Sequence, residues 1–414
     1  MSEPNTNLNQ KNSVIITAVS LHPIRTPRVS GDDSQHVLIR LETDSGLVGV
    51  GEYADITDLP LTMPDLDDLQ KSLSNVLCGQ NAMELARLDN LLSLLFTGRG
   101  DTGIYTGSLR AGIEMALHDL AGKALNVPVY VLFGGPVRTR IKVCFPIFRN
   151  LRDQHIEQNL ALVERLLGEG FDVFRLYIGG APDFDEKFLA ELRNQIGDRI
   201  IMQSFDLSNH VHPCDAVRLI NRCRKYYEPQ YVESVAPTHD LDGMAEVRRK
   251  LDIPVSEHVG DSRHAIRMWE ARAVDIINVA NSAHGGMRES LKVFAVAEAL
   301  GLRTILSTTQ ETSLGTAAEA HVGAAVLNVH YPTVAIGPKL YTEDPARNRI
   351  RYVDGYMIVP DGPGLGIEVD WDKVEALRYQ IGWREYGIDH SAPDIHELKW
   401  KVDISTGLKG MRKR

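Results

Sequence analysis

The sequence predicts an α/β protein, in which a modified (β/α)8 TIM barrel follows an N-terminal α+β domain. Two observations lead to this fold class. Short apolar runs alternate with helical stretches from about residue 140 onward, and hairpin-like strands with two helical segments precede them. Eight strands alternating with helices over roughly 200 residues favour a closed parallel barrel over an open sheet.

Residues 1–140 are predicted to form the small α+β domain. Asp44-Ser45-Gly46 has the composition of a hairpin turn between two strands. In the longer of the two expected helices, apolar residues recur every three or four positions and so form one buried face. The expected strands lie at 14–21, 37–42 and 47–50, and the expected helices at about 83–95 and 108–125.

Residues 141–370 are predicted to form the barrel, and residues 371–414 a C-terminal segment that returns to the N-terminal domain. The barrel strands are recognised as apolar, β-branched runs bounded by turn residues. Helical periodicity appears between most of them, for example at 159–167, 188–195 and 290–300. The expected barrel strands are 142–145, 173–178, 200–205, 231–234, 254–257, 275–279, 303–307 and 333–336.

Composition restricts the class of protein. The 414 residues carry a net charge of −10, which gives no basic surface for nucleic acid or an anionic membrane. The four cysteines lack CxxC pairing and are expected to be reduced. The N-terminus lacks an apolar signal core, and no apolar run reaches 18 residues. These features predict a cytoplasmic protein without membrane or nucleic-acid partners.

Acidic residues and a histidine recur at the ends of three successive predicted strands. Asp206, Glu233 and the pair Glu257-His258 are separated by 27 and then 24 or 25 residues. One strand, one helix and two loops of a barrel take about that length, so these side chains should converge at one mouth. Three such ligands would bind a divalent cation, and oxygen donors favour Mg²⁺. Alternatively, each residue caps the helix that follows it.

Several motifs resemble the enolase superfamily, specifically its mandelate racemase and muconate lactonizing enzyme branch. They are LRAGIEMALHDLAGKALNVPVYVLFGG at 109–135, Gly285-Gly286, and ETSLGTAAEAH at 311–321. The resemblance implies a capping domain over a modified TIM barrel, a small-molecule carboxylic acid as substrate, and a homo-oligomer. It also implies abstraction of the proton α to a carboxylate, with the enediolate held on Mg²⁺.

Within that resemblance, Asp206 and Glu233 match the first two metal ligands. The third ligand is either His258 or Glu257, because the usual Gly-Glu pair has become Glu257-His258. Related galactarate dehydratases favour His258. The other side chain would then lie behind the site or face the substrate.

The second barrel strand departs from the lysine pair that most members carry. It places Arg175 and Tyr177 on one side, by the period-two alternation of a strand. A guanidinium beside a phenol favours the phenolate, so this pair is a candidate base unit. It resembles the Arg-x-Tyr pair of a galactarate dehydratase group. Alternatively, Arg175 binds the substrate carboxylate while Tyr177 packs in the barrel.

The opposite face carries no strong base, because the sixth strand ends in Ala280. Racemases and epimerases of the branch carry an aspartate or a lysine there. Tyr105, in the loop before the long helix, would protonate the leaving hydroxyl, by analogy with the same dehydratases. The residues expected to contact the substrate are Tyr53, Asn281, Thr308, Thr309 and Glu311.

These observations favour a Mg²⁺-dependent dehydratase of a sugar acid, an aldonate or a galactarate-like aldarate. It would eliminate a β-hydroxyl and yield a 2-keto-3-deoxy acid. Two alternatives stay open. One is a racemase, epimerase or cycloisomerase of another carboxylic acid, and the other is a catalytically inactive binding homologue.

Overall fold

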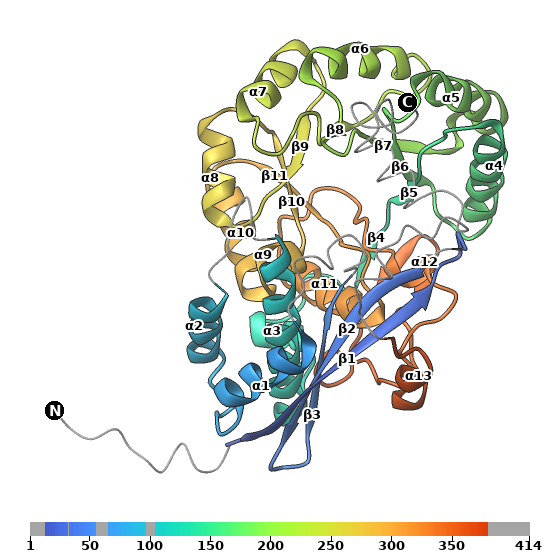
Figure 1. Ribbon diagram of the computed structural model, residues 1–414. Helices are drawn as coiled ribbons and strands as arrows, with labels where there is room; N and C mark the ends of the chain where they lie inside the picture. The colour runs from blue at the N-terminus through green and yellow to red at the C-terminus, as the bar shows by residue number, and fades with distance from the viewer. Residues whose placement is uncertain (1–12, 32, 55–64, 97–103, 380–414) are drawn as a thin grey trace, which may run out of the picture.

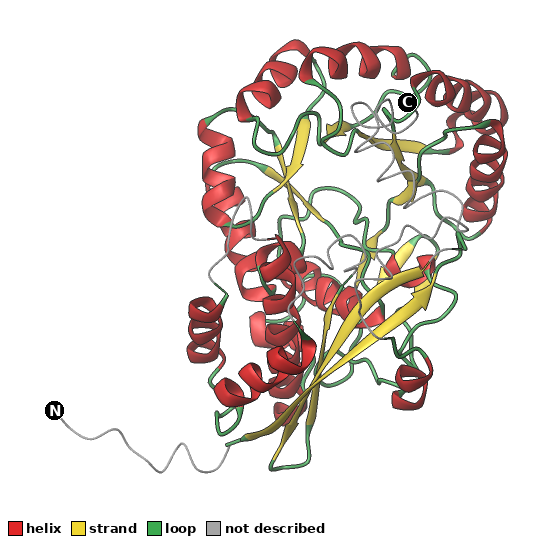
Figure 2. Cartoon of the chain, viewed as in Figure 1, coloured by secondary structure: helices red, strands yellow, loops and turns green. Residues whose placement is uncertain are grey.

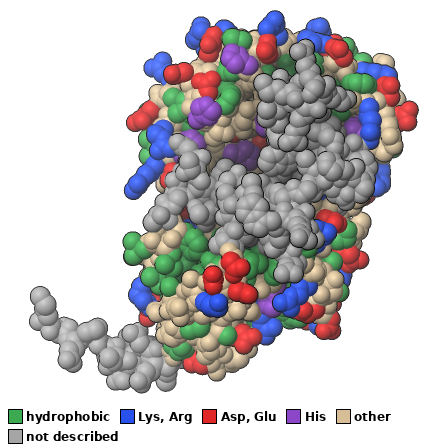
Figure 3. All heavy atoms as spheres, viewed as in Figure 1, with side chains coloured by type: hydrophobic (Ala, Val, Ile, Leu, Met, Phe, Trp, Pro, Cys, Tyr) green, Lys and Arg blue, Asp and Glu red, His purple; other side chains and the backbone are tan. Residues whose placement is uncertain are grey.

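The computed structural model describes residues 13–31, 33–54, 65–96 and 104–379, with side chains in the last range from residue 107 onward. The chain forms an N-terminal α+β domain below a curled parallel sheet that is ringed by helices (Figure 1). The predicted fold class is therefore confirmed. Figure 3 shows Lys and Arg side chains interspersed with Asp and Glu over the outer helices of the face in view.

The N-terminal domain is an antiparallel three-stranded sheet in the order β1-β2-β3, packed against α3. Glycines allow this packing, because a Cβ on Gly51 of β3 would lie 1.9 Å from the carbonyl oxygen of Gly112 in α3. The helix α1 was not expected from the sequence. The elements are β1 (Ile16–Pro27), β2 (Asp33–Thr43), β3 (Val48–Tyr53), α1 (Leu66–Leu77), α2 (Leu85–Leu95), α3 (Ile104–Leu125) and the 3-10 turn η3 (Val129–Phe133).

Seven parallel strands form the barrel sheet in the order β5 to β11, and their helices lie on the outside (Figure 2). Each strand follows the previous one with its C-terminal end at the same mouth, as right-handed crossovers require. The strands are β5 (Phe145–Ile147), β6 (Val173–Tyr177), β7 (Ile201–Asp206), β8 (Tyr231–Glu233), β9 (Val255–His258), β10 (Ile276–Val279) and β11 (Arg303–Leu306).

The outer helices are α4 (Asp153–Gly168), α5 (Pro182–Ile196), the 3-10 turn η4 (Gly197–Arg199), α6 (Pro213–Cys223), α7 (Leu241–Lys250), α8 (Ser262–Glu270), α9 (Asn281–His284), α10 (Met287–Ala299) and α11 (Ser313–Ala325). Most of the outer helices bury one apolar face, whereas α9 and α11 are buried nearly all round.

The eighth strand position is occupied by residues 331–334, which make bridges in place of a regular strand. Thr333 pairs in parallel with Val143, and Tyr331 with Ile305, so this segment joins β11 to the start of the sheet. Pro332 has no N–H to donate, which explains why the pairing stays irregular. The predicted strand 333–336 is thus shifted and reduced to bridges, but the barrel closes where it was expected.

After the barrel the chain returns to the N-terminal domain. The backbone N–H of Arg25 donates to Leu377 over 2.9 Å, and the rings of His22 and Trp371 lie 5.0 Å apart. These contacts place residues 371–379 along β1. The remaining elements are α12 (Gly337–Leu340), α13 (Trp371–Ala376) and a small sheet of β12 (Tyr352–Val353), β13 (Tyr356–Ile358) and β4 (Arg140–Lys142).

Two carboxylates of the N-terminal domain cap helices of the barrel. Glu52 of β3 accepts from the N–H of Thr312 (2.8 Å) and of Gly315 (2.9 Å) at the start of α11. Glu114 of α3 accepts from the first two N–H groups of α10, at 3.0 and 3.1 Å. A helix N-terminus leaves its first N–H groups without intrahelical partners, so these contacts fix the two parts together.

Candidate active site

The C-terminal ends of β6 to β9 bring the predicted residues together. Tyr177, Asp206 and Glu233 are partners in the sheet register, and His258 ends the next strand. The side chains of Arg175, Asp206 and Glu233 are all buried. The barrel mouth therefore gathers two carboxylates, a guanidinium, a phenol and an imidazole, as the strand-end spacing predicted.

Arg175 lies between the two carboxylates. Its guanidinium is 2.6 Å from Oδ2 of Asp206 and 3.0 Å from Oε1 of Glu233, and it also donates to the hydroxyl of Tyr177. Burial alone would lower the pKa of Arg175, but the charges of Glu233, Tyr177 and Asp206 raise it. The guanidinium is therefore a permanent cation within this group.

Tyr177 is held on both faces of its ring. Phe148 stacks on it with ring centroids 5.5 Å apart, and the guanidinium of Arg175 lies 4.6 Å from the ring centre. Burial raises the pKa of Tyr177, and the Asp206 and Glu233 carboxylates raise it further, whereas Arg175 lowers it. The sequence argument counted only Arg175, so the net direction differs from that expectation: the phenol is protonated at neutral pH.

The donors around Glu233 suit a divalent cation. Oε1 of Glu233 lies 3.2 Å from Nε2 of His258 and accepts from the amide of Asn278 (2.8 Å), while Oε2 is buried without a hydrogen-bond partner among the described residues. In this part of the chain no three His, Cys, Asp or Glu side chains already surround a single point. Chemically the set fits Mg²⁺, which would compete with Arg175 for the same oxygens.

Glu257 points away from Glu233. Its carboxylate accepts from Ser234 Oγ (3.1 Å), from the N–H of His258 (2.8 Å) and from the amide of Asn209 (2.7 Å). Burial raises its pKa to about 7. Of the two candidates for the third ligand, only the imidazole of His258 is turned toward Glu233.

The residues expected on the opposite face organise the loop after β11. Glu311 accepts from Thr308, from Ser282 (3.1 Å) and from both the N–H and the hydroxyl of Thr309. Asn281 donates its N–H to Glu319 over 2.6 Å, and its buried side-chain amide has no partner among the described residues. Thr309 and Glu311 thus bond within the protein, and Thr308 alone of these lines a cavity.

Of the two candidate tyrosines of the N-terminal domain, Tyr53 does not join this group. Tyr53 is buried in the hydrophobic core formed by β2, α1 and α3. The side chain of Tyr105 lies outside the described residues, as do the glycine-rich residues before it.

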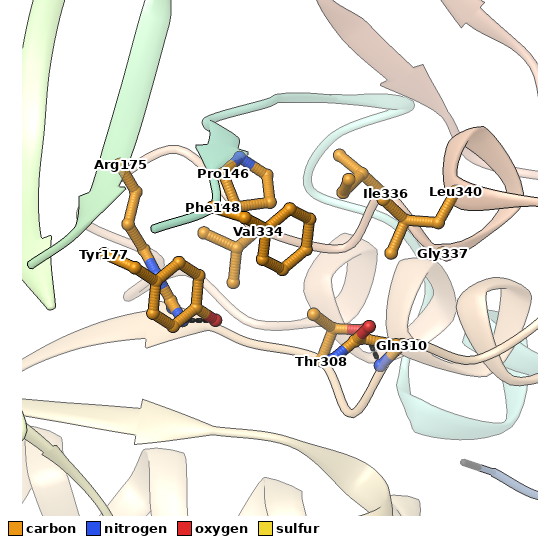
Figure 4. A pocket seen from close by; sticks show the side chains of 10 residues that line it. All are labelled: Pro146, Phe148, Arg175, Tyr177, Thr308, Gln310, Val334, Ile336, Gly337 and Leu340. Atoms are coloured by element: carbon orange, nitrogen blue, oxygen red, sulfur yellow. Dashed lines mark hydrogen bonds between the residues drawn. The ribbon is translucent and has the colours of Figure 1, made fainter. Parts of the chain in front are cut away.

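A small cavity opens beside Arg175 and Tyr177 (Figure 4). Its other polar lining residues are Thr308 and Gln310. The opposite wall is apolar and comes from β5, the residue after it, and the chain from the eighth strand position to α12. That wall consists of Pro146, Phe148, Val334, Ile336, Gly337 and Leu340.

Comparison with known families matches both parts of the chain. Residues 11–134 match the mandelate racemase / muconate lactonizing enzyme N-terminal domain, and residues 158–373 match the domain described as enolase C-terminal domain-like. The chain belongs to the mandelate racemase / muconate lactonizing enzyme family of the enolase superfamily.

Characterised relatives in this family carry out different reactions. N-succinyl-L-Arg/Lys racemase of Bacillus cereus is 26% identical over 87% of this chain and 97% of its own. D-xylonate dehydratase of Haloferax volcanii is 28% identical over 85% and 87%, and muconate cycloisomerase 1 of Rhodococcus opacus is 30% identical over 64% and 71%. Muconate cycloisomerase from Pseudomonas fluorescens shares the fold, with a TM-score of 0.79 at 24% identity, over 89% of this chain and 100% of that structure.

This chain is therefore an enzyme of the enolase superfamily, and its relatives catalyse several different reactions. Sequence reasoning missed the apolar wall of the cavity. Pro146 and Phe148 alternate at the end of β5 as Arg175 and Tyr177 do on β6, and that alternation was the available signal. Among the described residues, no helix has the length and hydrophobicity to cross a bilayer.

Proposed function

We propose that this protein is a Mg²⁺-dependent sugar-acid dehydratase. It removes the proton α to a carboxylate and expels the β-hydroxyl, giving an enol that becomes a 2-keto-3-deoxy acid. The observation that carries the proposal is the contact of Arg175 with Tyr177 beside the two carboxylates Asp206 and Glu233.

Asp206, Glu233 and His258 are the residues that would hold the cation. The unpartnered, buried Oε2 of Glu233 and the direction of the His258 imidazole support this set. When bound, a divalent cation stabilises the negative charge that develops on the substrate carboxylate as the α-proton leaves. Glu257 would position His258 by accepting its backbone N–H.

Tyr177 would take the α-proton after losing its own proton, and because its pKa is raised in this structure, the phenolate would form only where the positive charge of a bound cation offsets the Asp206 and Glu233 carboxylates. Arg175 and, more weakly, Arg149 are the groups that lower the pKa of Tyr177, so they stabilise the ionised form. Phe148 fixes the ring, which keeps the phenol oxygen at one position in the cavity. General base catalysis of this kind contributes about 10²- to 10⁴-fold in rate.

The opposite strand end supports elimination over inversion. β10 ends at Val279 and is followed by Ala280, which has no ionisable group. Inversion at the α-carbon needs an acid or base on each face, whereas loss of a β-hydroxyl needs one basic face and a proton donor. Racemisation and epimerisation are therefore second to dehydration here.

One observation favours an inactive binding homologue as the alternative. Arg175 already supplies both carboxylates with a positive charge from the chain itself. A protein that binds carboxylic acids without turning them over would carry such a built-in cation.

The test is a panel of aldonic and aldaric acids incubated with the protein and Mg²⁺. Formation of 2-keto acid and change of optical rotation are followed together. We expect keto acid from at least one acid and a loss of about a hundredfold or more in Tyr177→Phe, which keeps the ring. Tyr227→Phe, which changes a buried tyrosine outside the cavity, is the matched control. Epimerisation without keto acid overturns the proposal, and no reaction of any acid favours the binding homologue.

A further inference from the structure

The cavity beside Tyr177 presents two unlike walls. Six of its ten lining residues are Pro146, Phe148, Val334, Ile336, Gly337 and Leu340, which offer no side-chain hydrogen-bonding group. Val334 and Ile336, two residues apart, both line this cavity. In Figure 4 they lie with Phe148 across the cavity from Thr308 and Gln310.

Most polar groups of the cavity have partners within the protein, although Nε of Arg175 is buried without one among the described residues. The hydroxyl of Thr308 donates to Glu311 and accepts from the N–H of Gln310 over 3.0 Å. The side-chain oxygen of Gln310 accepts from Arg28 of the N-terminal domain. Arg175 is committed to Asp206, Glu233 and Tyr177. A ligand hydroxyl that enters here gains few new hydrogen bonds in exchange for the water it leaves.

We infer that the substrate is a hydroxy acid whose end farthest from the reacting carboxylate is an alkyl group. This inference rests on the proposed function, which places the carboxylate near Asp206 and Glu233 and the α-proton near Tyr177. The rest of the molecule then extends past Tyr177 toward Val334, Ile336 and Leu340. Burying an unpaired hydroxyl there is unfavourable, and burying a second carboxylate is more so.

The apolar wall distinguishes sugar acids by the group at their terminal carbon. A hexonate carries a hydroxyl at its terminal carbon, a 6-deoxyhexonate carries a methyl group there, and a hexarate carries a carboxylate. Against the apolar wall the three should bind in the order deoxy acid, hexonate, hexarate. A pocket of this kind separates a methyl group from a hydroxyl-bearing isostere by about ten- to a hundredfold.

The experiment measures binding by titration calorimetry in Mg²⁺, with Tyr177→Phe to prevent turnover. Sets of hexonate, 6-deoxyhexonate and hexarate with matched configuration are compared. We expect the deoxy acid of at least one set to bind about tenfold or more tightly than its hexonate, and the hexarate to bind most weakly. Equal or tighter binding of hexonate or hexarate in every set, or no binding of any deoxy acid, overturns the inference.

Two valine variants locate the preference. Val334→Thr keeps the shape of the wall but adds a hydroxyl, and should reduce the ratio of deoxy acid to hexonate affinity by about threefold or more. Val259→Thr changes a buried valine just after β9, outside the cavity lining, and should leave the ratio unchanged. Thermal unfolding of both variants checks that each is folded. A ratio that is unchanged in Val334→Thr, or equally changed in both, also contradicts the inference.

The outcome separates this inference from the proposed function. The expected binding order with no keto acid formed by the wild-type protein would overturn dehydration and leave the substrate preference in place. Keto acid produced from hexarates, together with tighter binding of hexarates, would support dehydration and overturn the inferred substrate preference.

Discussion

The guanidinium of Arg175 contacts the carboxylates of Asp206 and Glu233 and donates to the hydroxyl of Tyr177. Its contacts with Asp206 (2.6 Å) and Glu233 (3.0 Å) place a positive charge where the proposed cation would bind. Two cations cannot share the same buried oxygens without strong repulsion, so metal binding must displace or loosen this side chain. Arg175 and Mg²⁺ are therefore competitors for the site.

Removing that competitor should strengthen metal binding. We expect Arg175→Met to raise Mg²⁺ affinity about tenfold or more, measured by titration calorimetry, although turnover is lost. The same change should lower the stability of the protein without metal, because Asp206 and Glu233 then lie buried without a partner charge. Arg149→Met, near Tyr177 but not bonded to either carboxylate, is the control and should leave affinity within about threefold. Weaker binding in Arg175→Met would show that this arginine helps to build the metal site.

His258 makes metal binding dependent on pH. Burial lowers the pKa of His258, but the hydrogen bond with Glu233 and the charges of Glu233 and Glu257 together raise it more, so the net pKa lies above the usual 6.5. The imidazole must be neutral to bind a cation, so affinity should fall as pH falls through that raised pKa, by about tenfold per pH unit below it. Affinity measured between pH 8 and pH 6 checks this expectation.

Variants are needed to assign that pH dependence, because Glu257 has a pKa of about 7 and ionises in the same range. His258→Asn should weaken metal binding and flatten its pH dependence. Glu257→Gln should keep most of the pH dependence of metal affinity. If Glu257→Gln flattens the dependence and His258→Asn leaves it intact, Glu257 is the ligand.

Among the elements, α10 and α11 depend on carboxylates from the other end of the chain. Glu52 of β3 accepts from the start of α11, and its carboxylate lies 2.8 Å from Nδ1 of the buried His36. Burial raises the pKa of Glu52, but His36 and Thr312 lower it more, so the net pKa lies below the usual 4.5. A depressed pKa stabilises the folded state above the unfolded pKa, and that stability is lost as pH falls through the folded value.

Glu52→Gln should therefore destabilise the protein at neutral pH, by about 2–4 kcal/mol. The difference from wild type in unfolding free energy, measured with urea, should stay constant above about pH 5.5 and shrink below about pH 4.5 as Glu52 in the wild type becomes protonated. Glu42→Gln, on the exposed side of β2, should show little difference at any pH. A pH-independent loss in Glu52→Gln would mean that its hydrogen bonds, not its charge, carry the effect.

The barrel strands were readable from the sequence because each is a short apolar run followed by a polar strand end. Asp206, Glu233 and the pair Glu257-His258 were found by that rule, and the structure brings Asp206, Glu233 and His258 together. The capping role of Glu52 could not be read, because it acts on a helix some 260 positions away in the chain. The apolar cavity wall was missed for the same reason: Phe148 and Leu340 meet only once the barrel closes.

In the whole molecule, the two parts share buried contacts. Besides the carboxylates that cap α10 and α11, Arg110 of α3 donates to the carbonyl of Gly285, and Asp119 accepts from the N–H of Leu365 (2.9 Å). The segment 371–379 then lies back along β1. Neither part would keep these groups satisfied if the other unfolded.

We therefore expect the chain to unfold in one cooperative calorimetric transition. Calorimetric and van't Hoff enthalpies should agree for wild type. Asp119→Asn combined with Glu114→Gln should weaken the contacts between the N-terminal domain and the barrel and split the unfolding transition in two. Asp242→Asn on the outer helix α7 should leave a single transition. Two transitions in the wild-type protein would show that the capping domain and the barrel are energetically independent.

The eighth strand position of the barrel is joined to its neighbours by isolated bridges. Residues 331–334 close the ring through bridges on either side of Pro332, while Asp206, Glu233 and His258 end strands of the parallel sheet, where one register shift lies between β6 and β7. Transient local opening is easiest where the hydrogen-bond ladder is sparsest, so amide exchange should concentrate there. The same chain continues into the apolar wall at Val334 and Ile336. We therefore expect local opening of the barrel on the side toward which the alkyl end of the proposed substrate extends. The side that carries Asp206, Glu233 and His258 should stay closed.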